Sequence, residues 1–261
     1  MSVEQFSRYE MKYAVRPEQL PYLQSAIARY CDLDGFYPVE GKSTYTVDTL
    51  YFDSADWRIF HAAENQEIVR SKLRVRTYPD APGAPAKIEV KRRIKDKILK
   101  TGAVVSLDRW QQLLCGAAPL HSQPAATRRA IEEFLTLQRI LDASPRMLIR
   151  YQRRAYSSRI DDYVRITFDS QIRFQPQSRY VLSGAPMRWQ FTDDEESIGL
   201  RGDLLMELKF KERPPIWIAD IIRSLGLIRQ GYSKYCSAVR HCRYDWPRLW
   251  DLAPASEALR V

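Results

Sequence analysis

The sequence has few of the residues on which many binding and catalytic motifs depend. Its 261 residues include ten glycines, three histidines and four cysteines. Neither GxxxxGK[ST] nor GxGxxG occurs, which excludes the common glycine-rich phosphate loops as the basis of function. The cysteines show no CxxC pattern and few histidines could help them bind zinc, so we expect reduced, structural thiols in a cytoplasmic protein.

Long apolar runs are also absent. No stretch of 18 consecutive apolar residues exists, and residues 1–10 are polar, without the apolar segment of a secretory signal. We therefore expect no transmembrane segment. Hydrophobic residues still make up 45% of the chain, enough for a substantial core. No linker or repeat divides the sequence, so we expect a single domain over residues 1–261, ending in a helical tail at about 236–261.

The charge balance favours one sign. The chain carries 41 lysines and arginines against 32 aspartates and glutamates, a net charge of +9. Such an excess indicates an anionic partner, whether nucleic acid, an acidic membrane surface or a phosphorylated small molecule.

Charged residues occupy every second position in four segments. Because successive side chains of a strand point to opposite faces, this spacing predicts strands with one charged face and one apolar face. Between the charges lie apolar residues such as Leu73 and Val75. The four segments contain Arg8, Glu10 and Lys12; Arg70, Lys72, Arg74 and Arg76; Glu89, Lys91 and Arg93; and Glu207, Lys209 and Lys211.

The charged faces could be in bulk water or could line a cavity. A wet sheet face also alternates polar and apolar residues. The four basic residues from Arg70 to Arg76, however, repel one another unless an anion lies among them. A lumen lined by them must hold water and a polyanion, and a linear phosphate chain fits best. A divalent metal would reconcile the nearby glutamates with such a ligand.

The secondary-structure pattern indicates an α+β fold with roughly eight antiparallel strands. Helical spacing covers residues 17–30, 127–141 and 216–225, and Ser106 is a plausible N-cap of a further helix. Strands are predicted at 7–15, 45–52, 67–78, 86–94, 97–105, 146–157, 164–169, 171–174 and 204–210.

Eight motifs in order give the chain a family resemblance. The sequence resembles the VTC domain, the polyphosphate polymerase branch of the triphosphate tunnel metalloenzymes in the CYTH-like superfamily. The motifs are RYEMKY at 8–13, TLYFD at 49–53, KLRVRTY at 72–78, IEVK at 88–91, YQRRAY at 151–156, VRITFD at 164–169, LMELKF at 205–210 and YSKY at 232–235.

The resemblance implies a closed eight-stranded antiparallel β-barrel, the triphosphate tunnel fold, with flanking helices. It further implies transfer of the γ-phosphoryl group of ATP to a growing polyphosphate chain, with Mn²⁺ or Mg²⁺ required. The partners would be ATP and inorganic polyphosphate or triphosphate. We predict as catalytic Arg74, Arg76, Lys91, Arg153, Arg165 and Lys209, and as substrate-binding Lys12, Lys72, Lys97, Lys100, Tyr151, Ser233 and Lys234. The resemblance implies Glu207 as a metal ligand, and the charge argument above adds Glu10 and Glu89.

Three alternatives remain open at this point. Related tunnel enzymes hydrolyse tripolyphosphate or nucleoside triphosphates with the same groups. A non-catalytic polyphosphate-binding protein is suggested by Gly231, where the family often has lysine. Nucleic-acid binding is disfavoured, because the basic residues are expected to face inward. The sequence gives no prediction of the oligomeric state.

Overall fold

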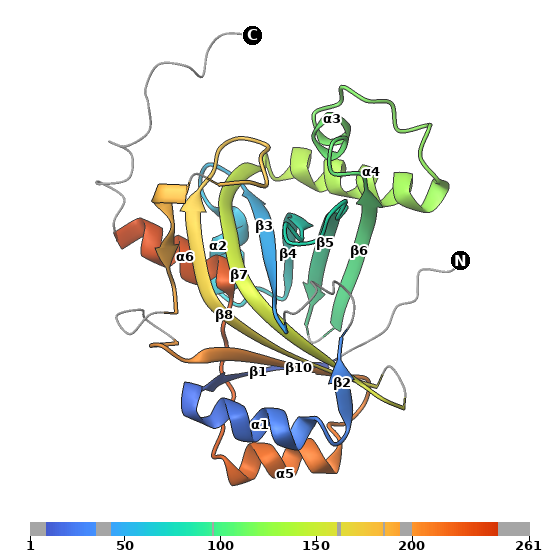
Figure 1. Cartoon of the computed structure of the whole chain (residues 1–261). Helices are drawn as coiled ribbons and strands as arrows, with labels where there is room; N and C mark the ends of the chain where they lie inside the picture. Colours follow the sequence, from blue (N-terminus) through green and yellow to red (C-terminus); the bar gives the residue numbers. More distant parts are fainter. Residues whose placement is uncertain are drawn as a thin grey trace.

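A large, strongly curved antiparallel sheet dominates the protein, and helices cover its outer face (Figure 1). The structure is a computed structural model that describes residues 9–34, 43–95, 97–160, 163–184, 186–193 and 200–244. The strands are β1 (Tyr9–Val15), β2 (Cys31–Leu33), β3 (Tyr45–Asp53), β4 (Val69–Thr77), β5 (Ala86–Ile94), β6 (Lys97–Val105), β7 (Ser144–Ser158), β8 (Val164–Pro176), β9 (Gln190–Phe191) and β10 (Leu204–Phe210).

The helices lie mainly between strands in the sequence. The α-helices are α1 (Leu20–Ile27), α2 (Arg58–Glu64), α3 (Trp110–Leu114), α4 (Ala125–Ile140), α5 (Ile216–Ser224) and α6 (Lys234–Tyr244), and short 3-10 turns occupy Pro17–Gln19 and Pro186–Arg188. Helix α6 covers the first part of the predicted C-terminal tail, and residues 245–261 lie outside the described part of the chain. No helix within the described ranges is long and apolar enough to cross a membrane.

The main strands follow the order β1-β10-β8-β7-β3-β4-β5-β6, with β2 paired to β7 and β9 to β8. Strands β1 and β6 end this order, and no backbone pairing joins them within the described residues. The prediction of a closed barrel is therefore wrong, although eight antiparallel strands do form the main sheet. Closure requires the edge strands to pair with a consistent stagger. Here the two ends approach through side chains instead, since Lys91 of β5 lies 3.0 Å from Glu10 of β1.

Two apolar cores stabilise the sheet from its outer side. Residues such as Leu73 and Ile88 pack with Phe134 of α4 and are almost fully buried. Residues such as Leu208 pack in a second cluster with Leu23 of α1 and with α5. Each such buried side chain contributes about 1.5–3 kcal/mol. Because the apolar faces of β1, β4, β5 and β10 are covered by helices, their charged faces point to the concave side.

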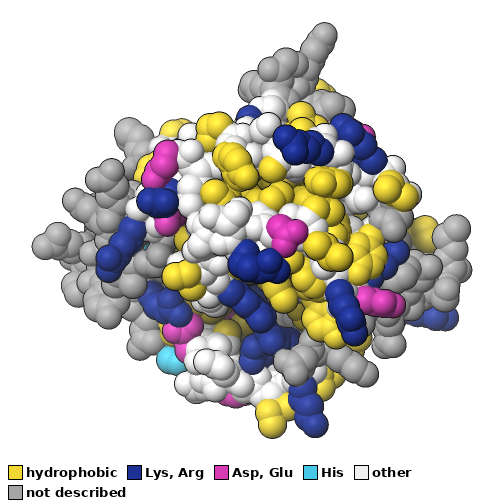
Figure 2. Space-filling view, turned by 90° about the horizontal axis from the view of Figure 1, so that it is seen from below, with side chains coloured by type: hydrophobic (Ala, Val, Ile, Leu, Met, Phe, Trp, Pro, Cys, Tyr) yellow, Lys and Arg dark blue, Asp and Glu magenta, His cyan; other side chains and the backbone are white. Residues whose placement is uncertain are grey.

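The outer surface of α1 and α5 also carries apolar side chains, visible on the face in Figure 2. Tyr22 is 56% exposed and Ile216 is 80% exposed. Tyr30 stacks on Trp217 with ring centroids 4.4 Å apart, which joins the end of α1 to α5.

One strand is continuous where the sequence predicted two. Strand β8 runs through residues 164–176, and Gln171 in its middle has a φ of 50°. This left-handed conformation bends the strand without ending it. Helix α6 crosses to the concave side, where Tyr235 stacks on Tyr51 of β3 and donates a hydrogen bond to buried Asp53 at 2.5 Å.

Candidate functional site

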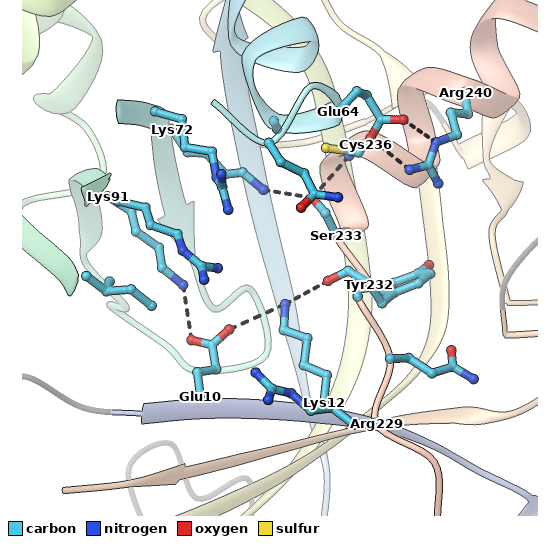
Figure 3. Close-up of a pocket in the computed structure, with 17 residues that line it drawn as sticks. Glu10, Lys12, Glu64, Lys72, Lys91, Arg229, Tyr232, Ser233, Cys236 and Arg240 are labelled. Carbon is cyan, nitrogen blue, oxygen red and sulfur yellow. Dashed lines mark hydrogen bonds and ion pairs between the residues drawn. The ribbon is translucent and has the colours of Figure 1, made fainter. Parts of the chain in front are cut away.

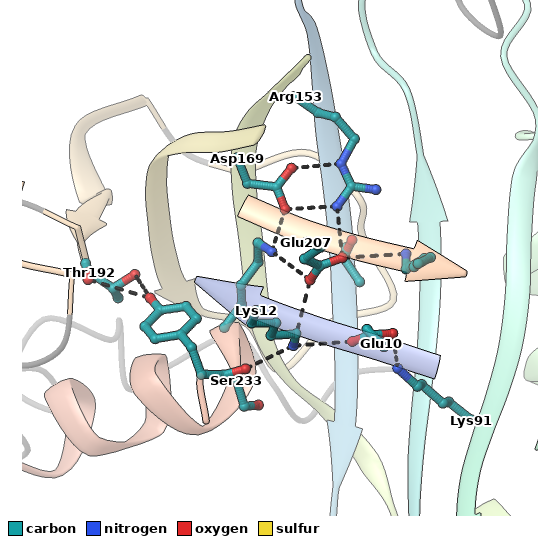
Figure 4. Close-up of polar contacts among 12 residues, drawn as sticks. Glu10, Lys12, Lys91, Arg153, Asp169, Thr192, Glu207 and Ser233 are labelled. Atoms are coloured by element: carbon teal, nitrogen blue, oxygen red, sulfur yellow. Dashed lines mark hydrogen bonds and ion pairs between the residues drawn. The ribbon is translucent and has the colours of Figure 1, made fainter. Parts of the chain in front are cut away.

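A network of buried and half-buried charges occupies the concave face where β1, β10, β8 and β7 meet (Figure 4). Backbone register places its members side by side. Lys12 faces Glu207 across the β1–β10 pair, and Arg153 faces Asp169 across the β7–β8 pair. The alternation in the sequence thus puts charges from distant segments on one surface, as the cavity interpretation requires.

Glu207 is the central carboxylate of this network and is 7% exposed. Its carboxylate oxygens lie within ion-pair distance of four cations: Lys209 at 3.4 Å, Lys234 at 3.5 Å, Lys12 at 3.6 Å and Arg153 at 3.8 Å. Burial raises the pKa of Glu207, but Lys234, Lys209 and Lys12 together hold it well below its usual value. Glu207 is therefore ionised at neutral pH.

Asp169 is a second, fully buried carboxylate next to Glu207. Arg153 donates two hydrogen bonds to it, at 2.6 and 2.8 Å, and the Lys234 ammonium lies 2.5 Å away. Burial raises the pKa of Asp169, but the opposing effect of Arg153 and Lys234 is larger. The pKa of Asp169 therefore lies below its usual value. Such bidentate pairing fixes the guanidinium in one orientation. Arg153 and Lys234 also flank the ring of Tyr151, with their charged groups 5.1 and 4.7 Å from its centroid.

Glu10 extends the network toward the other end of the sheet. Its carboxylate lies 3.4 Å from Lys12 and 3.0 Å from Lys91. Burial and the Glu207 carboxylate both raise the pKa of Glu10, but Lys91, Lys12 and Lys209 lower it to about 2. The pKa of Lys209 is also lowered, but here burial is the cause. Burial outweighs the raising effect of Glu207 and Glu10 and lowers the Lys209 pKa to about 8.

The third predicted metal ligand, Glu89, lies in a separate group of charges on β4, β5 and β6. It accepts a hydrogen bond from Arg74 at 2.8 Å and pairs with Lys100. Burial raises the pKa of Glu89, and Arg74, Arg76 and Lys100 lower it well below its usual range. The structure thus brings Glu10 and Glu207 together at Lys12 and places Glu89 with its own cations.

Two predicted phosphate ligands have no carboxylate partner in the described part of the chain. Arg76 donates to Thr49 Oγ1 at 3.2 Å, and Lys72 donates to Ser233 Oγ at 2.7 Å. Ser233 Oγ also accepts the backbone N–H of Cys236 at 3.2 Å, which leaves its own hydroxyl proton free to donate. Neither side chain forms an ion pair within the described residues, although the charge of Glu89 acts on Arg76 from the neighbouring strand.

A cavity of about 580 Å³ opens beside this network, between the sheet, α2 and α6 (Figure 3). Predicted residues that line it are Glu10, Lys12, Lys72, Lys91 and Ser233. The Lys12 ammonium donates to the Tyr232 carbonyl at 2.8 Å, which ties β1 to the segment before α6. Lys12 therefore belongs both to the network around Glu207 and to the wall of the cavity.

The remaining predicted residues take different positions. Arg165 forms an ion pair with Asp34 at 2.6 Å. Lys97 begins β6, and its side chain lies outside what the structure describes.

Sequence reasoning missed part of the cavity wall. Glu64 of α2 and Arg240 of α6 line it and form a bidentate ion pair, at 2.8 and 2.7 Å. Arg240 is seven residues, or two helical turns, after Ser233, so helical spacing could have placed it on the same side. Glu64 lies in no charged alternation, and nothing in the sequence marks it.

Comparison with known families decides the assignment. The sequence model of the VTC domain matches residues 7–242, which is most of the chain. The chain belongs to the VTC domain family. This confirms the resemblance seen in the eight ordered motifs. A search of curated protein sequences found no significant match to this VTC domain.

Several solved structures resemble this VTC domain at low identity. A candidate adenylate cyclase from Bacillus halodurans is 13% identical, with a TM-score of 0.49 over 87% of this chain and 95% of that one. A candidate adenylyl cyclase from Hippeastrum, described as having dominant triphosphatase activity, is 14% identical, with a TM-score of 0.49 over 89% and 95%. A protein from Pyrococcus horikoshii is 9% identical, with a TM-score of 0.44 over 90% and 98%. Because every score is below 0.5, the family assignment rests on the VTC match.

Two carboxylates of this VTC domain, Glu10 and Glu207, lie beside the same lysine, Lys12. Magnesium-like ions bind through one or two carboxylates together with phosphate oxygens. Glu10 and Glu207 are ionised, share Lys12 and lie beside the cationic surface. Among the residues that the structure describes, no group of three metal-ligating side chains occurs. A metal held here would therefore need oxygens from a phosphorylated ligand to complete its coordination.

Proposed function

We propose that this protein is a metal-dependent polyphosphate polymerase that transfers the γ-phosphoryl group of ATP to a polyphosphate chain. The observation that carries the proposal is the continuation of cations along β4 into the cavity. Arg70, Lys72, Arg74 and Arg76 lie on one face, and the six residue steps from the first to the last span about 20 Å. This span exceeds the length of a triphosphate, so it suits a longer chain.

The lack of a direct ion pair at two cations of this array supports the same ligand. Arg76 and Lys72 have no carboxylate partner within the described ranges, and burial lowers the pKa of Lys72, with Lys12 and Lys91 lowering it further. A phosphate chain would relieve this repulsion by supplying counter-charges along the strand.

Phosphoryl transfer needs positioning and charge stabilisation more than covalent chemistry. In this proposal Arg74, Arg76 and Lys91 hold the phosphate oxygens from one side, and Arg153 and Lys209 hold them from the other. Asp169 keeps Arg153 in a fixed orientation through its two hydrogen bonds. No histidine is needed as a nucleophile, since the acceptor is the terminal phosphate of the chain itself.

A divalent metal would neutralise charge on the transferred phosphoryl group. We assign Glu207 and Glu10 as the residues that hold it, because both lie beside Lys12 and the four cations around Glu207 stand 3.4–3.8 Å from its oxygens. Glu89 lies elsewhere on the sheet and accepts a closer hydrogen bond from Arg74, at 2.8 Å. The resemblance implies Mn²⁺ or Mg²⁺, and both accept the oxygen ligands that these carboxylates provide.

An incubation of pure protein with ATP, Mn²⁺ and a short polyphosphate primer tests the proposal. Lengthening of the primer with release of ADP is expected. Release of orthophosphate without chain growth would identify a tripolyphosphatase or nucleoside triphosphate hydrolase instead. Tight polyphosphate binding without turnover under either metal would identify a binding protein.

A further inference from the structure

A groove of about 480 Å³ runs between α1 and α5, on the outer side of the sheet and away from the charged network (Figure 2). Tyr22 and Tyr30 line it on the α1 side, and Ile216 and Trp217 line it on the α5 side. Tyr22, Tyr30 and Ile216 are all exposed. Apolar side chains grouped in this way mark an interaction surface, whereas scattered ones are common on any protein.

The two helices that form the groove are held to each other at both ends. The ring of Tyr30 stacks on that of Trp217 with the centroids 4.4 Å apart, and the Gln19 side-chain amide donates to the Leu225 carbonyl at 3.2 Å. Leu23 anchors α1 in the second apolar core. A partner would therefore meet a preformed surface, which loses little conformational freedom on binding.

The apolar surface continues beyond Tyr30. The backbone N–H of Arg159 donates to the Tyr30 carbonyl at 3.2 Å, and the next residue, Ile160, is 94% exposed. Leu33, three residues after Tyr30, is also exposed. We call this surface the outer apolar patch; it consists of Tyr22, Tyr30, Leu33, Ile160 and Ile216.

The charges beside the groove indicate what covers it. Two charged residues stand among the described residues that line it, and their signs are opposite. Arg29 lies on the α1 side and forms no ion pair within the described ranges, and Asp220 lies on the α5 side, where it pairs with exposed Arg223 at 2.9 Å. An acidic membrane would favour an excess of cations in the lining. A two-fold axis along the groove instead places Arg29 of each copy opposite Asp220 of the other, so the groove is complementary to itself.

We propose that the outer apolar patch and the groove form a two-fold interface with a second copy of this chain. In this dimer α1 of one copy lies against α5 of the other, so the exposed side chains of Tyr22 and Ile216 become buried. Arg29 and Asp220 form two equivalent ion pairs across the interface. The concave faces of both copies stay open, because the interface lies on the other side of each sheet. The inference does not depend on the proposed reaction.

Sedimentation velocity of the full chain over a concentration series tests the dimer. The wild type is expected to pass from monomer to dimer with a dissociation constant in the micromolar range. Ile216→Glu should raise this constant about a hundredfold or more, because each dimer loses the burial of two isoleucine side chains. Ile216 is the first residue of α5, where a carboxylate suits the helix dipole, so the fold should tolerate the change.

Ile140→Glu is the matched control. Ile140 is also a largely exposed isoleucine, but it ends α4, which packs against β5 and β6. This variant should dimerise with the dissociation constant of the wild type. Thermal unfolding of the monomers identifies any variant whose fold has been weakened.

Charge reversal tests the two-fold geometry. Arg29→Glu alone, or Asp220→Arg alone, turns both opposite-charge contacts of the dimer into like-charge contacts, and each should weaken self-association about tenfold. In an equimolar mixture of the two variants both contacts again join opposite charges. The mixture should therefore form heterodimers as strong as the wild-type dimer.

Three results would overturn the proposal. The first is a wild type that stays monomeric at the highest soluble concentration. The second is a dimer that Ile216→Glu leaves intact, or mixed charge variants that fail to pair, because either would exclude this two-fold interface. The third comes from vesicles of phosphatidylserine and phosphatidylcholine: binding of the monomer to them, lost in Ile216→Glu, would assign the patch to a lipid surface.

Discussion

The Lys91 ammonium on β5 lies 3.0 Å from the Glu10 carboxylate on β1, although these strands belong to opposite ends of the sheet. This ion pair joins the two ends where a barrel would have backbone hydrogen bonds. Both residues also line the cavity. A side-chain pair opens at far lower cost than a paired strand, so this joint between the two ends of the sheet is weaker than a barrel's would be.

Replacing Lys72 should separate stability from ligand binding. Lys72 is a buried cation that donates to Ser233 and has no carboxylate partner in the described residues. We expect Lys72→Met to raise the melting temperature of the ligand-free protein, by about 2 to 4 °C for each kcal/mol gained. The same change should weaken polyphosphate binding, as calorimetry would show. A variant that is less stable yet binds as well would contradict the assignment.

Arg153 should be far more important for stability than Arg165. Arg153→Ala leaves buried Asp169 with Lys234 alone, and breaking a buried pair costs about 3–5 kcal/mol. Arg165→Ala breaks a more exposed pair with Asp34 and should cost about 1 kcal/mol or less. Chemical denaturation of both variants measures the difference. Equal losses would show that the network around Asp169 does not hold the sheet together.

Glu89 should make the protein sensitive to acid. Its folded-state pKa lies below the unfolded value, chiefly because Arg74 and Arg76 outweigh the effect of burial. The unfolded state therefore binds the proton first, so the stabilisation is present above about pH 4.5 and is lost as pH falls below it. Glu89→Gln should flatten the decline of unfolding free energy below this pH. An unchanged slope would mean that other carboxylates carry the acid sensitivity.

Glu207→Gln should abolish turnover without abolishing binding. The change removes the central carboxylate that we propose to hold the metal and leaves four cations around the site. We expect the rate of ATP consumption to fall by about 10²- to 10³-fold, on the scale of other losses of transition-state stabilisation. Polyphosphate affinity should stay equal or rise. Wild-type turnover in this variant would remove Glu207 from the mechanism.

Local pattern predicted much of the sheet. The alternation around residues 70–76 predicted a strand at 67–78, and β4 spans residues 69–77. Strands predicted at 86–94, 97–105 and 204–210 match β5, β6 and β10. Each of these strands can be recognised from residues close together in the sequence, because charged and apolar side chains must point to opposite faces.

Long-range relations were not predictable in the same way. Closure depends on whether β1 and β6 meet, and no single segment contains that information. The pairing register of the strands also sets the partners of the glutamates. Glu89 pairs with Arg74 of the adjacent strand, while Glu10 and Glu207 both lie beside Lys12. Three equivalent-looking glutamates thus have two different environments.

The fate of the γ-phosphoryl group tests the central claim most directly. Protein is incubated with γ-labelled ATP, Mn²⁺ and a polyphosphate primer, and the products are separated by size. We predict that the label enters chains longer than the primer, in amounts equal to the ADP released. Label recovered as orthophosphate, with the primer unchanged, would contradict the assignment of this protein as a polyphosphate polymerase.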